Sequence, residues 1–353
     1  MRTGVALAGP FAYAWEVESP KLEAFRVVAS DRDGRLLEGR YRIVGLLGSG
    51  STADVYLAED EVERTPVVVK WLTPGAALNR QIRGRFLLEA AAAKSVDHPA
   101  VRRVLSTLDS NDESPYVVME ALPGEPLSDY LEKNGPLAEP LALDLARMIA
   151  AGLCAAHAAG IVHRDLKPAN LFVVQIPGAP LHVKLIDFGF AKDTRADPDA
   201  GPSSQNLVLG TAQYMAPEQV LAEPVDPRTD VYGFGVVLFR VLTGHLPFDL
   251  ELGVDLFGHQ LYSPMPPPSW LVDGLDPGLE AIVLRCTRKH PDNRYPSMRA
   301  VLEDLECVAN GTPISDLPLQ REPDLFKPRQ ASGREAAEAL AAHFGKDRPG
   351  PLG

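Results

Sequence analysis

Short apolar runs that alternate with polar residues dominate the chain between residues 41 and 120. The runs are rich in β-branched residues and are separated by turn residues, a pattern that predicts β-strands. One stretch within this region carries alanines and leucines at helical spacing and predicts a helix over about residues 79–95. The predicted strands are residues 41–47, 54–58, 65–72, 101–109 and 116–120.

After residue 124 the apolar residues recur mainly at helical spacing. A mostly β region followed by a mostly α region predicts an α+β fold with two lobes, and the cleft between two lobes is the usual place for a ligand. The predicted helices are residues 140–159, 216–221, 230–243, 278–288 and 297–308, with short strands at 171–174 and 183–186.

The domain boundaries are predicted from changes in composition. We expect one domain over residues 39–308, with a small, mostly β N-terminal lobe (39–121) and a larger, mostly α C-terminal lobe (122–308). Gly-Pro and Ser-Pro breaks make residues 1–38 an N-terminal extension. Residues 309–353 are rich in Pro, Gly and charged residues, which predicts a flexible tail.

Composition narrows the class of protein. The 353 residues are 45% hydrophobic and 23% charged, as in an ordinary soluble protein, and the net charge of −12 argues against nucleic-acid binding. Cys154, Cys286 and Cys307 are widely spaced, which predicts reduced thiols and not a disulfide or a metal site. Residues 1–14 make a poor signal peptide, and no run reaches the ~20 apolar residues of a membrane helix. We therefore expect a cytoplasmic protein without membrane contact.

The richest chemistry lies in residues 161–170, Ile-Val-His-Arg-Asp-Leu-Lys-Pro-Ala-Asn, which predict a loop. Such a loop can point the carboxylate of Asp165 at a hydroxyl, Lys167 at a phosphate and the amide oxygen of Asn170 at a metal. The stretch resembles the catalytic loop of the protein kinases, H-R-D-x-x-x-x-N. The order Asp-Leu-Lys-Pro is typical of serine/threonine kinases.

A glycine-rich stretch, Gly48-Ser-Gly50-Ser-Thr-Ala53, lies between two predicted strands. A dinucleotide-binding fingerprint would precede a helix, so this stretch predicts a hairpin that offers backbone N–H groups to nucleotide phosphates. The resemblance implies that Val55 packs on the adenine, and Ala53 replaces the family's third glycine. The chain has no G-x-x-x-x-G-K-[ST] motif, which disfavours the ordinary ATPases and GTPases.

Lys70 ends the run Val-Val-Val-Lys, which resembles the family's V-A-I-K strand. A buried ammonium needs an anion, and the resemblance offers the nucleotide phosphates and Glu89 on the following helix. Val68 in place of the usual alanine should narrow the adenine pocket. The ATP-binding residues that the resemblance implies are Leu47, Gly48, Gly50, Val55, Val68, Lys70, Met119, Glu120, Leu122 and Phe172.

Asp187-Phe188-Gly189 follows a predicted strand, as the D-F-G motif does in the family. The resemblance implies that Asp187 and Asn170 bind Mg²⁺, or Mn²⁺ in its place. It also implies that Asp165 orients the acceptor hydroxyl or takes its proton, while Lys167 neutralises charge on the phosphoryl group in transfer. Positioning and charge compensation then account for the catalysis.

Residues 187–218 resemble the family's activation segment and end in Gly-Thr211-Ala-Gln-Tyr-Met-Ala-Pro-Glu. The resemblance implies that Thr211 hydrogen-bonds Asp165 and Lys167 beside the phosphoacceptor. The polar middle of the segment predicts mobility, and a phosphate there would be attracted to Arg164, Lys192 and Arg85. The candidate phosphosites are Ser203, Ser204 and Thr194, and the alternative is a solvated loop with incidental serines.

Three charged residues read as structural by the same resemblance. Asp230 would cap a helix and accept the backbone N–H groups of the His163–Arg164 turn. Glu218 and Arg294 would form a buried ion pair that anchors the substrate side of the large lobe.

The resemblance covers roughly residues 41–308 and is strongest to the bacterial, Hanks-type serine/threonine kinases. It implies an enzyme that uses Mg-ATP, acts on protein substrates and autophosphorylates in its activation segment, with a homodimer as one route for that reaction in trans. The rivals are a pseudokinase that binds nucleotide or partners and a kinase for small molecules. Intact Lys70, Asp165, Asn170 and Asp187 argue against the first rival.

Three features leave alternatives open. The proline-rich loop 261–270 is either a docking surface or an exposed connector. The predicted helix at residues 334–344 is either an autoinhibitory or docking element or a frayed tail. Ala93, one turn after Glu89, fills little space against Phe188, which is the basis for the hypothesis of an inactive resting state.

Overall fold

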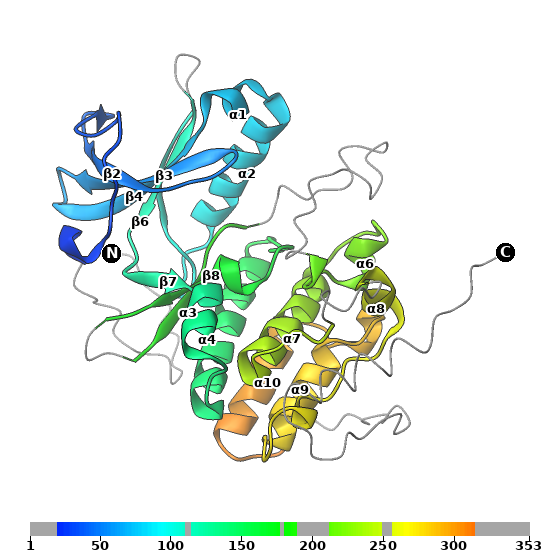
Figure 1. Ribbon diagram of the computed structural model, residues 1–353. Coiled ribbons are helices and arrows are strands. Elements are labelled where there is room, and N and C mark those ends of the chain that lie inside the picture. Colours follow the sequence, from blue (N-terminus) through cyan, green and yellow to red (C-terminus); the bar gives the residue numbers. More distant parts are fainter. Residues whose placement is uncertain (1–19, 110–113, 177–179, 189–211, 249–255, 315–353) are drawn as a thin grey trace, which may run out of the picture. The chain divides into compact units, whose positions relative to one another are not determined.

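The computed structural model describes residues 20–109, 114–176, 180–188, 212–248 and 256–314. The chain divides into two compact units (Figure 1). The sheet unit comprises Met1–Arg83 and Val104–Pro123, and the helical unit comprises Gly84–Arg103 and Gly124–Gly353. The predicted α+β fold, with a β-rich region preceding a helical one, is confirmed. The predicted domain ends at residues 39 and 308 stay predictions, and the predicted tail helix at 334–344 lies outside the described residues.

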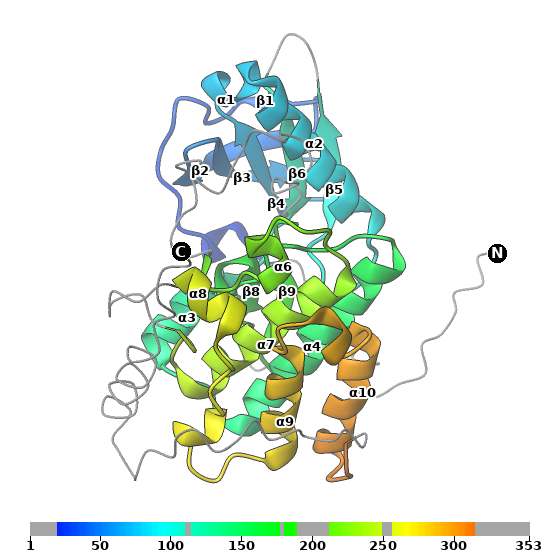
Figure 2. The same cartoon turned by 90° about the vertical axis from the view of Figure 1, so that its right-hand side faces the viewer.

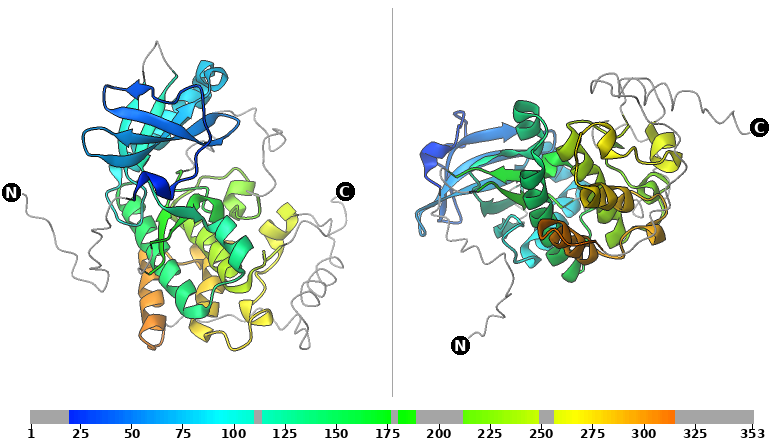
Figure 3. Two further views of the ribbon diagram at one scale, coloured as in Figure 1. Left: turned by 60° about the vertical axis from the view of Figure 1, so that its left-hand side comes forward. Right: turned by 90° about the horizontal axis from the view of Figure 1, so that it is seen from below.

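The sheet unit is built on a six-stranded antiparallel sheet in the order β1-β2-β3-β4-β6-β5, whose twist is visible in Figure 3. The two strands richest in β-branched and apolar residues, β4 and β6, have the bounds that the sequence predicts. The predicted strand 101–109 is shorter in the structure and starts at Val104. The strands are β1 (Leu36–Leu37), β2 (Tyr41–Ser49), β3 (Ala53–Asp60), β4 (Thr65–Leu72), β5 (Val104–Leu108) and β6 (Tyr116–Glu120).

Alternate residues of these strands make a core on one face of the sheet, as the period of two requires. Tyr56, Val69 and Trp71 belong to this buried cluster. The Trp71 ring meets the rings of Tyr56 and Tyr116 edge to face, with centroids 6.1 and 5.3 Å apart. Such aromatic pairs add stability beyond the area they bury.

Residues 26–37, here called the N-terminal strap, contact both the edge and this core of the sheet. Val28 exchanges two backbone hydrogen bonds of 2.8 Å with Leu46 on the outer edge of β2. The Arg32 guanidinium lies 3.9 Å above the centroid of the Trp71 ring and 5.4 Å from that of Tyr56. A cation over aromatic faces contributes about 0.5–2 kcal/mol. The sequence pattern, which assigns this segment to an extension, does not reveal these contacts.

Two helices follow the sheet's first four strands. The short α1 (Pro74–Leu78) is capped by the Thr73 hydroxyl, which accepts a hydrogen bond from the Ala76 N–H. The longer α2 (Arg80–Ser95) is preceded by Asn79, whose Oδ1 accepts from the N–H groups of Gln81 and Ile82 at 3.0 and 3.2 Å. The predicted helix is confirmed to within a residue, whereas α1, with Pro and Gly in five residues, gives no periodic signal.

The helical unit packs its helices around α7 (Pro227–Thr243), as Figure 2 shows. All residues of α7 from Thr229 to Thr243 except Arg240 are buried, so this helix is a central one. A Cβ on Gly235 would come within 2.6 Å of Cys286, so the glycine lets α9 approach closely. The other helices are α3 (Leu127–Asn134), α4 (Glu139–Ala158), α6 (Pro217–Val220), α8 (Leu256–Tyr262), α9 (Pro277–Cys286) and α10 (Met298–Ala309).

A three-stranded antiparallel sheet in the order β7-β8-β9 completes this unit. Its strands are β7 (Gly124–Pro126), β8 (Leu171–Val174) and β9 (His182–Leu185). Among the described helices, α4 is the one whose length and apolar composition would suit a membrane span, but it packs against α7, α10 and β9. Its apolar character is accounted for by this packing. The three cysteines are free thiols, as predicted.

We predict that Gly45→Ala loosens the N-terminal strap. A Cβ at this position would lie 2.8 Å from Val27 Cβ and 3.2 Å from the Val28 carbonyl oxygen, so the strap has to move. The expected loss of unfolding free energy is about 1–3 kcal/mol, with faster proteolysis within residues 20–37. Gly84→Ala is the control, because Gly84 lies inside α2 with nothing within 4 Å of its added Cβ. Gly84→Ala should raise the unfolding free energy by about 1 kcal/mol, because alanine has the higher helix propensity.

Urea unfolding and limited proteolysis of the whole chain measure both effects. Equal rates of strap proteolysis in wild type and in Gly45→Ala would show that the close contact of Gly45 with Val27 and Val28 does not hold the strap on the sheet.

Candidate active site

The loop between α4 and β8 brings three predicted catalytic and metal residues together. The Asp165 carboxylate oxygen Oδ2 lies 3.0 Å from Lys167 Nζ and 3.1 Å from Asn170 Nδ2. Asn170 Nδ2 also donates to the Asp165 carbonyl at 2.8 Å. The loop ends in the single 3₁₀ turn η2 (Pro168–Asn170), for which the proline supplies the required φ. An acid, an ammonium and an amide are therefore held within one hydrogen-bonded group.

A buried carboxylate, Asp230, holds the backbone of this loop. Its two oxygens accept the N–H groups of His163 and Arg164 at 2.7 and 2.8 Å, and His157 Nε2 lies 2.7 Å away. The expected contact with the His163–Arg164 turn is thus present. The predicted capping role is wrong, because α7 begins at Pro227 and the side chain of Asp226 caps it. Asp230 lies one turn further on, where it faces the loop and not its own helix end.

Two site residues have left-handed backbone conformations, Arg164 with φ 64° and Asp187 with φ 52°. Non-glycine residues rarely adopt this region, at a cost of order 1–3 kcal/mol each, and observed outliers gather at functional sites. The Arg164 N–H is bonded to Asp230, and the Arg164 carbonyl accepts from Gln219 Nε2 at 2.8 Å. Both backbone groups of this strained residue are therefore fixed from outside the loop.

His163 fills the space between the loop and Phe188. Its ring is fully buried and lies 5.0 Å from the Phe188 ring, and burial lowers the pKa of His163. The imidazole is therefore neutral near pH 7. Its Nδ1 accepts the N–H of Asp165 at 3.4 Å, which helps to set the direction of the Asp165 backbone.

Asp187 is placed beside the loop by β9. Leu185 pairs with Leu171 at the end of this strand, and the next N–H, that of Ile186, donates to the Asn170 carbonyl at 2.9 Å. Asp187 follows directly and is exposed, while Phe188 is buried. Of the two predicted metal residues, Asn170 therefore directly precedes β8 and Asp187 lies two residues after its neighbouring strand β9.

The donor set fits Mg²⁺. Asn170 uses its Nδ2 toward Asp165, which leaves its amide oxygen as the ligand atom, and Asp187 offers a carboxylate. Among the described residues no three His, Cys, Asp or Glu side chains gather into a cage. Mg²⁺ in phosphoryl-transfer sites is held in this way, by one or two protein oxygens together with substrate phosphates.

The glycine-rich stretch is a hairpin in the sheet unit, as predicted, because β2 and β3 flank it. Gly50 N–H donates to the Ala53 carbonyl at 3.0 Å and closes the turn. Gly48 pairs with Val55, and Val55 pairs with Lys70 on the next strand. Directly opposed residues of antiparallel strands point to the same face, so Val55 and Lys70 share a face of the sheet.

Val68 lies two residues before Lys70 on that face and pairs with Met119. Both Val68 and Met119 are buried, whereas Gly48 and Gly50 are exposed. The predicted ATP-binding residues of the sheet unit are Leu47, Gly48, Gly50, Val55, Val68, Lys70, Met119, Glu120 and Leu122.

The remaining predicted residues belong to the helical unit or are not described. Phe172 lies on β8, the strand that directly follows the loop that carries Asp165, and Glu89 lies on α2. Ala93 packs against the main core cluster, which also contains Phe188. The residues outside the described part of the chain are Thr211, the candidate phosphosites Ser203, Ser204 and Thr194, and Lys192.

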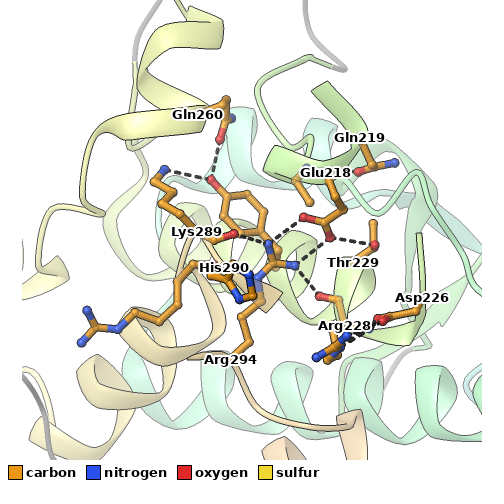
Figure 4. A network of polar contacts seen from close by, with 12 residues as sticks. Glu218, Gln219, Asp226, Arg228, Thr229, Gln260, Lys289, His290 and Arg294 are labelled. Atoms are coloured by element: carbon orange, nitrogen blue, oxygen red, sulfur yellow. Dashed lines mark hydrogen bonds and ion pairs between the residues drawn. The ribbon is translucent and has the colours of Figure 1, made fainter. Parts of the chain in front are cut away.

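A buried ion pair anchors the segment that follows residue 211, as the sequence predicts (Figure 4). Arg294 binds Glu218 through two parallel hydrogen bonds of 2.8 and 2.7 Å, and the Thr229 hydroxyl donates to the same carboxylate at 2.8 Å. The guanidinium also donates to the carbonyls of Arg228, Arg288 and Lys289. Both charged groups of this pair thus have hydrogen-bond partners in addition to each other, as a buried ion pair requires.

Sequence reasoning does not find Gln219. Its Oε1 accepts the Ala216 N–H at 3.1 Å while its Nε2 reaches the Arg164 carbonyl. The side chain therefore ties the end of this segment to the catalytic loop. No sequence signal marks such a residue, because both of its partners are backbone groups.

The chain is similar to known proteins in sequence and in fold. Residues 41–304 match the protein kinase domain family. The chain is 37% identical over 318 residues to the serine/threonine-protein kinase Pkn1 of Myxococcus xanthus, covering 86% of this chain and 45% of that protein. It is 38% identical over 283 residues to PknB of Mycobacterium tuberculosis (78% and 44%) and 35% identical over 286 residues to PknL of the same organism (80% and 70%).

The crystal structure of a variant of the Mycobacterium tuberculosis PknI kinase domain shares the fold. Its TM-score is 0.59 at 24% sequence identity, covering 80% of this chain and all of that one.

The chain therefore belongs to the protein kinase family, and the predicted two-lobed kinase fold is confirmed. Within that family it belongs with the bacterial serine/threonine protein kinases, as the sequence resemblance implied. The chain spans less than half the length of Pkn1 and PknB. Protein kinases as a family use ATP and a divalent metal and act on proteins.

We predict that Glu218→Ala lowers the unfolding free energy by about 3–5 kcal/mol, because it leaves the buried Arg294 charge without its partner. Asp292→Ala is the control, since it removes an ion pair with Arg228 in which the Asp292 side chain is 69% exposed. Asp292→Ala should lower the unfolding free energy by less than about 1 kcal/mol. Urea unfolding of the two variants beside wild type measures both, and similar losses would contradict the role of burial.

Proposed function

We propose that this chain is an ATP-dependent serine/threonine protein kinase that transfers the γ-phosphate of Mg-ATP to hydroxyl groups of proteins, with Mn²⁺ as a substitute metal. One observation carries the proposal. The Asp165 carboxylate lies against Lys167 Nζ and Asn170 Nδ2, in a loop joined by a backbone hydrogen bond to the strand end that carries Asp187. In this proposal, one hydrogen-bonded part of the helical unit would supply a base, a cation and two oxygen ligands.

Asp165 would orient the acceptor hydroxyl toward the γ-phosphorus and take its proton as the new P–O bond forms. Lys167, 3.0 Å from the Asp165 carboxylate, would meet the charge that spreads over the oxygens of the phosphoryl group in transfer. Asn170 and Asp187 would hold the divalent metal, which when bound neutralises phosphate charge. Because little covalent chemistry falls to the protein, the value of these groups lies in their fixed positions.

On the sheet unit, Gly48 and Gly50 frame the hairpin whose backbone N–H groups would meet the nucleotide phosphates. Lys70 would pair with the α- and β-phosphates and with Glu89, in the role that the V-A-I-K lysine has in this family. Val55, Val68 and Met119 are apolar and lie on the same face of that sheet, which suits an adenine ring. Autophosphorylation within the segment that contains Ser203 and Ser204 belongs to the same proposal.

We predict that Asp165→Asn lowers transfer of labelled γ-phosphate to a protein acceptor by about 10²–10⁴-fold, because the amide cannot take the hydroxyl proton. The amide keeps the size of the side chain, so thermal stabilisation by Mg-ATP should remain. Asp292→Asn, an exposed acid outside the site, is the control and should transfer label like wild type.

Two other outcomes are informative. Transfer that survives Asp165→Asn unchanged would remove this residue from the mechanism. ATP-dependent stabilisation of wild type with no transfer to itself or to any acceptor would identify a pseudokinase. Mapping of the label in active protein tests Ser203, Ser204 and Thr194 as phosphosites.

A further inference from the structure

Gln260 on α8 is a buried polar side chain that the mechanism above does not use. Its exposed fraction is 0%. Leu256 of the same helix belongs to a buried apolar cluster with Ala212 and Phe248. Gln260 Nε2 donates to the Gln213 carbonyl at 2.7 Å. The carbonyl belongs to residues 212–217, here called the acceptor segment, a turn that leads into the first residue of α6.

The direction of this hydrogen bond is fixed by a chain of donors that begins at a cation. Lys289 Nζ donates to the Tyr232 hydroxyl oxygen at 3.4 Å, and an ammonium can only donate. The Tyr232 hydroxyl must then give its own proton to Gln260 Oε1, 2.5 Å away. The Gln260 amide is thereby turned so that its NH₂ group faces the Gln213 carbonyl. Burial raises the pKa of Tyr232, which keeps the hydroxyl protonated as the chain requires.

Aromatic rings hold the start of this chain in place. The Lys289 ammonium lies 5.0 Å from the Phe248 ring centroid and 5.6 Å from that of Tyr232. The Arg294 guanidinium, which binds Glu218, lies 5.0 Å from the Tyr232 ring. Figure 4 shows Gln260, Lys289, Arg294 and Glu218 within one network. Hydrogen bonds in such a series polarise one another, so the last bond is stronger than it would be alone.

The acceptor segment is therefore held at two points. Gln260 holds the Gln213 carbonyl from α8, and Gln219 holds the Ala216 N–H and the Arg164 carbonyl of the catalytic loop. Between these points the segment carries Tyr214 and Met215. One backbone hydrogen bond, from the Met215 N–H to the Ala212 carbonyl at 3.2 Å, closes a turn within the segment. The two amides tie that turn to α8 and to the catalytic loop.

We propose that Gln260 is a positioning residue for the protein acceptor, acting through the Gln213 carbonyl. The inference rests on the proposed function and on the resemblance of residues 187–218 to the family's activation segment, the end of which the resemblance puts beside the phosphoacceptor. Gln260 then fixes the position of the backbone segment that the acceptor polypeptide would contact. The hydrogen bonds from Lys289 to Tyr232 and from Tyr232 to Gln260 fix Gln260 in turn. The nucleotide has no part in these contacts.

The test compares Gln260→Met and Gln260→Glu with wild type in the full chain. The methionine side chain is similar in length to that of glutamine but has no hydrogen-bond donor. Glutamate still accepts from Tyr232 but turns an oxygen toward the Gln213 carbonyl. For both variants the KM for a serine-containing acceptor peptide should rise by about tenfold, the scale of one hydrogen bond. The KM for ATP and the slow hydrolysis of ATP, in which water replaces the peptide, should change less than twofold.

Tyr295→Phe is the matched control. It also removes one buried hydrogen bond from the helical unit, that from the Tyr295 hydroxyl to Asp304 at 2.7 Å, but it leaves the acceptor segment alone. Its loss of thermal stability should resemble that of Gln260→Met, while its KM for the peptide should stay at the wild-type value.

Two results would overturn the inference. One is a folded Gln260→Met protein with an unchanged KM for the peptide. The other is an equal fall of peptide phosphorylation and ATP hydrolysis in both variants and in Tyr295→Phe, which is the sign of a purely structural role. Failure of the proposed function looks different, because wild type itself would then phosphorylate no acceptor.

Discussion

The position of the catalytic loop depends on one buried carboxylate. Asp230 accepts two backbone N–H groups of that loop and lies on α7, a helix buried along almost all of its length. A helix enclosed on all sides cannot shift without disturbing its neighbours, so the loop inherits the rigidity of the core. The left-handed conformation of Arg164 persists for the same reason: the surroundings determine it, although the residue itself disfavours it.

Irregular segments near the site are held in place by side-chain amides that hydrogen-bond to backbone groups. Gln219, Gln260 and Asn170 each use an amide to hold an irregular piece of chain that has no ladder of its own. Irregular backbone has the freedom to place chemical groups where a helix or strand could not, but its polar groups must be satisfied when buried. The kinase fold of this chain meets both needs by placing the amides on regular elements, α6 and α8, or next to a strand.

Much of this fold is legible in the sequence. Strands β4 and β6 consist mostly of apolar and β-branched residues, and the motif residues Asp165, Asn170 and Asp187 are of types that the chemistry restricts. Other parts of the fold and of the site could not be predicted from the sequence. Helices of five to eight residues, such as α1 and α3, are too short to show a period, and Asp230 reads as a cap when the cap is Asp226. Gln219 and Gln260 bind backbone carbonyls, which every residue has, so no pattern of residue types betrays them.

The N-terminal strap has a consequence for where the domain begins. The family match starts at residue 41, whereas the strap covers the outer edge of β2 through Val28 and lays Arg32 across Trp71. A fragment cut at residue 41 would retain every motif of a kinase and still expose an unpaired strand edge, the kind of surface on which proteins aggregate. The residues that the family match covers and the residues that complete the sheet are, in this chain, of different extents.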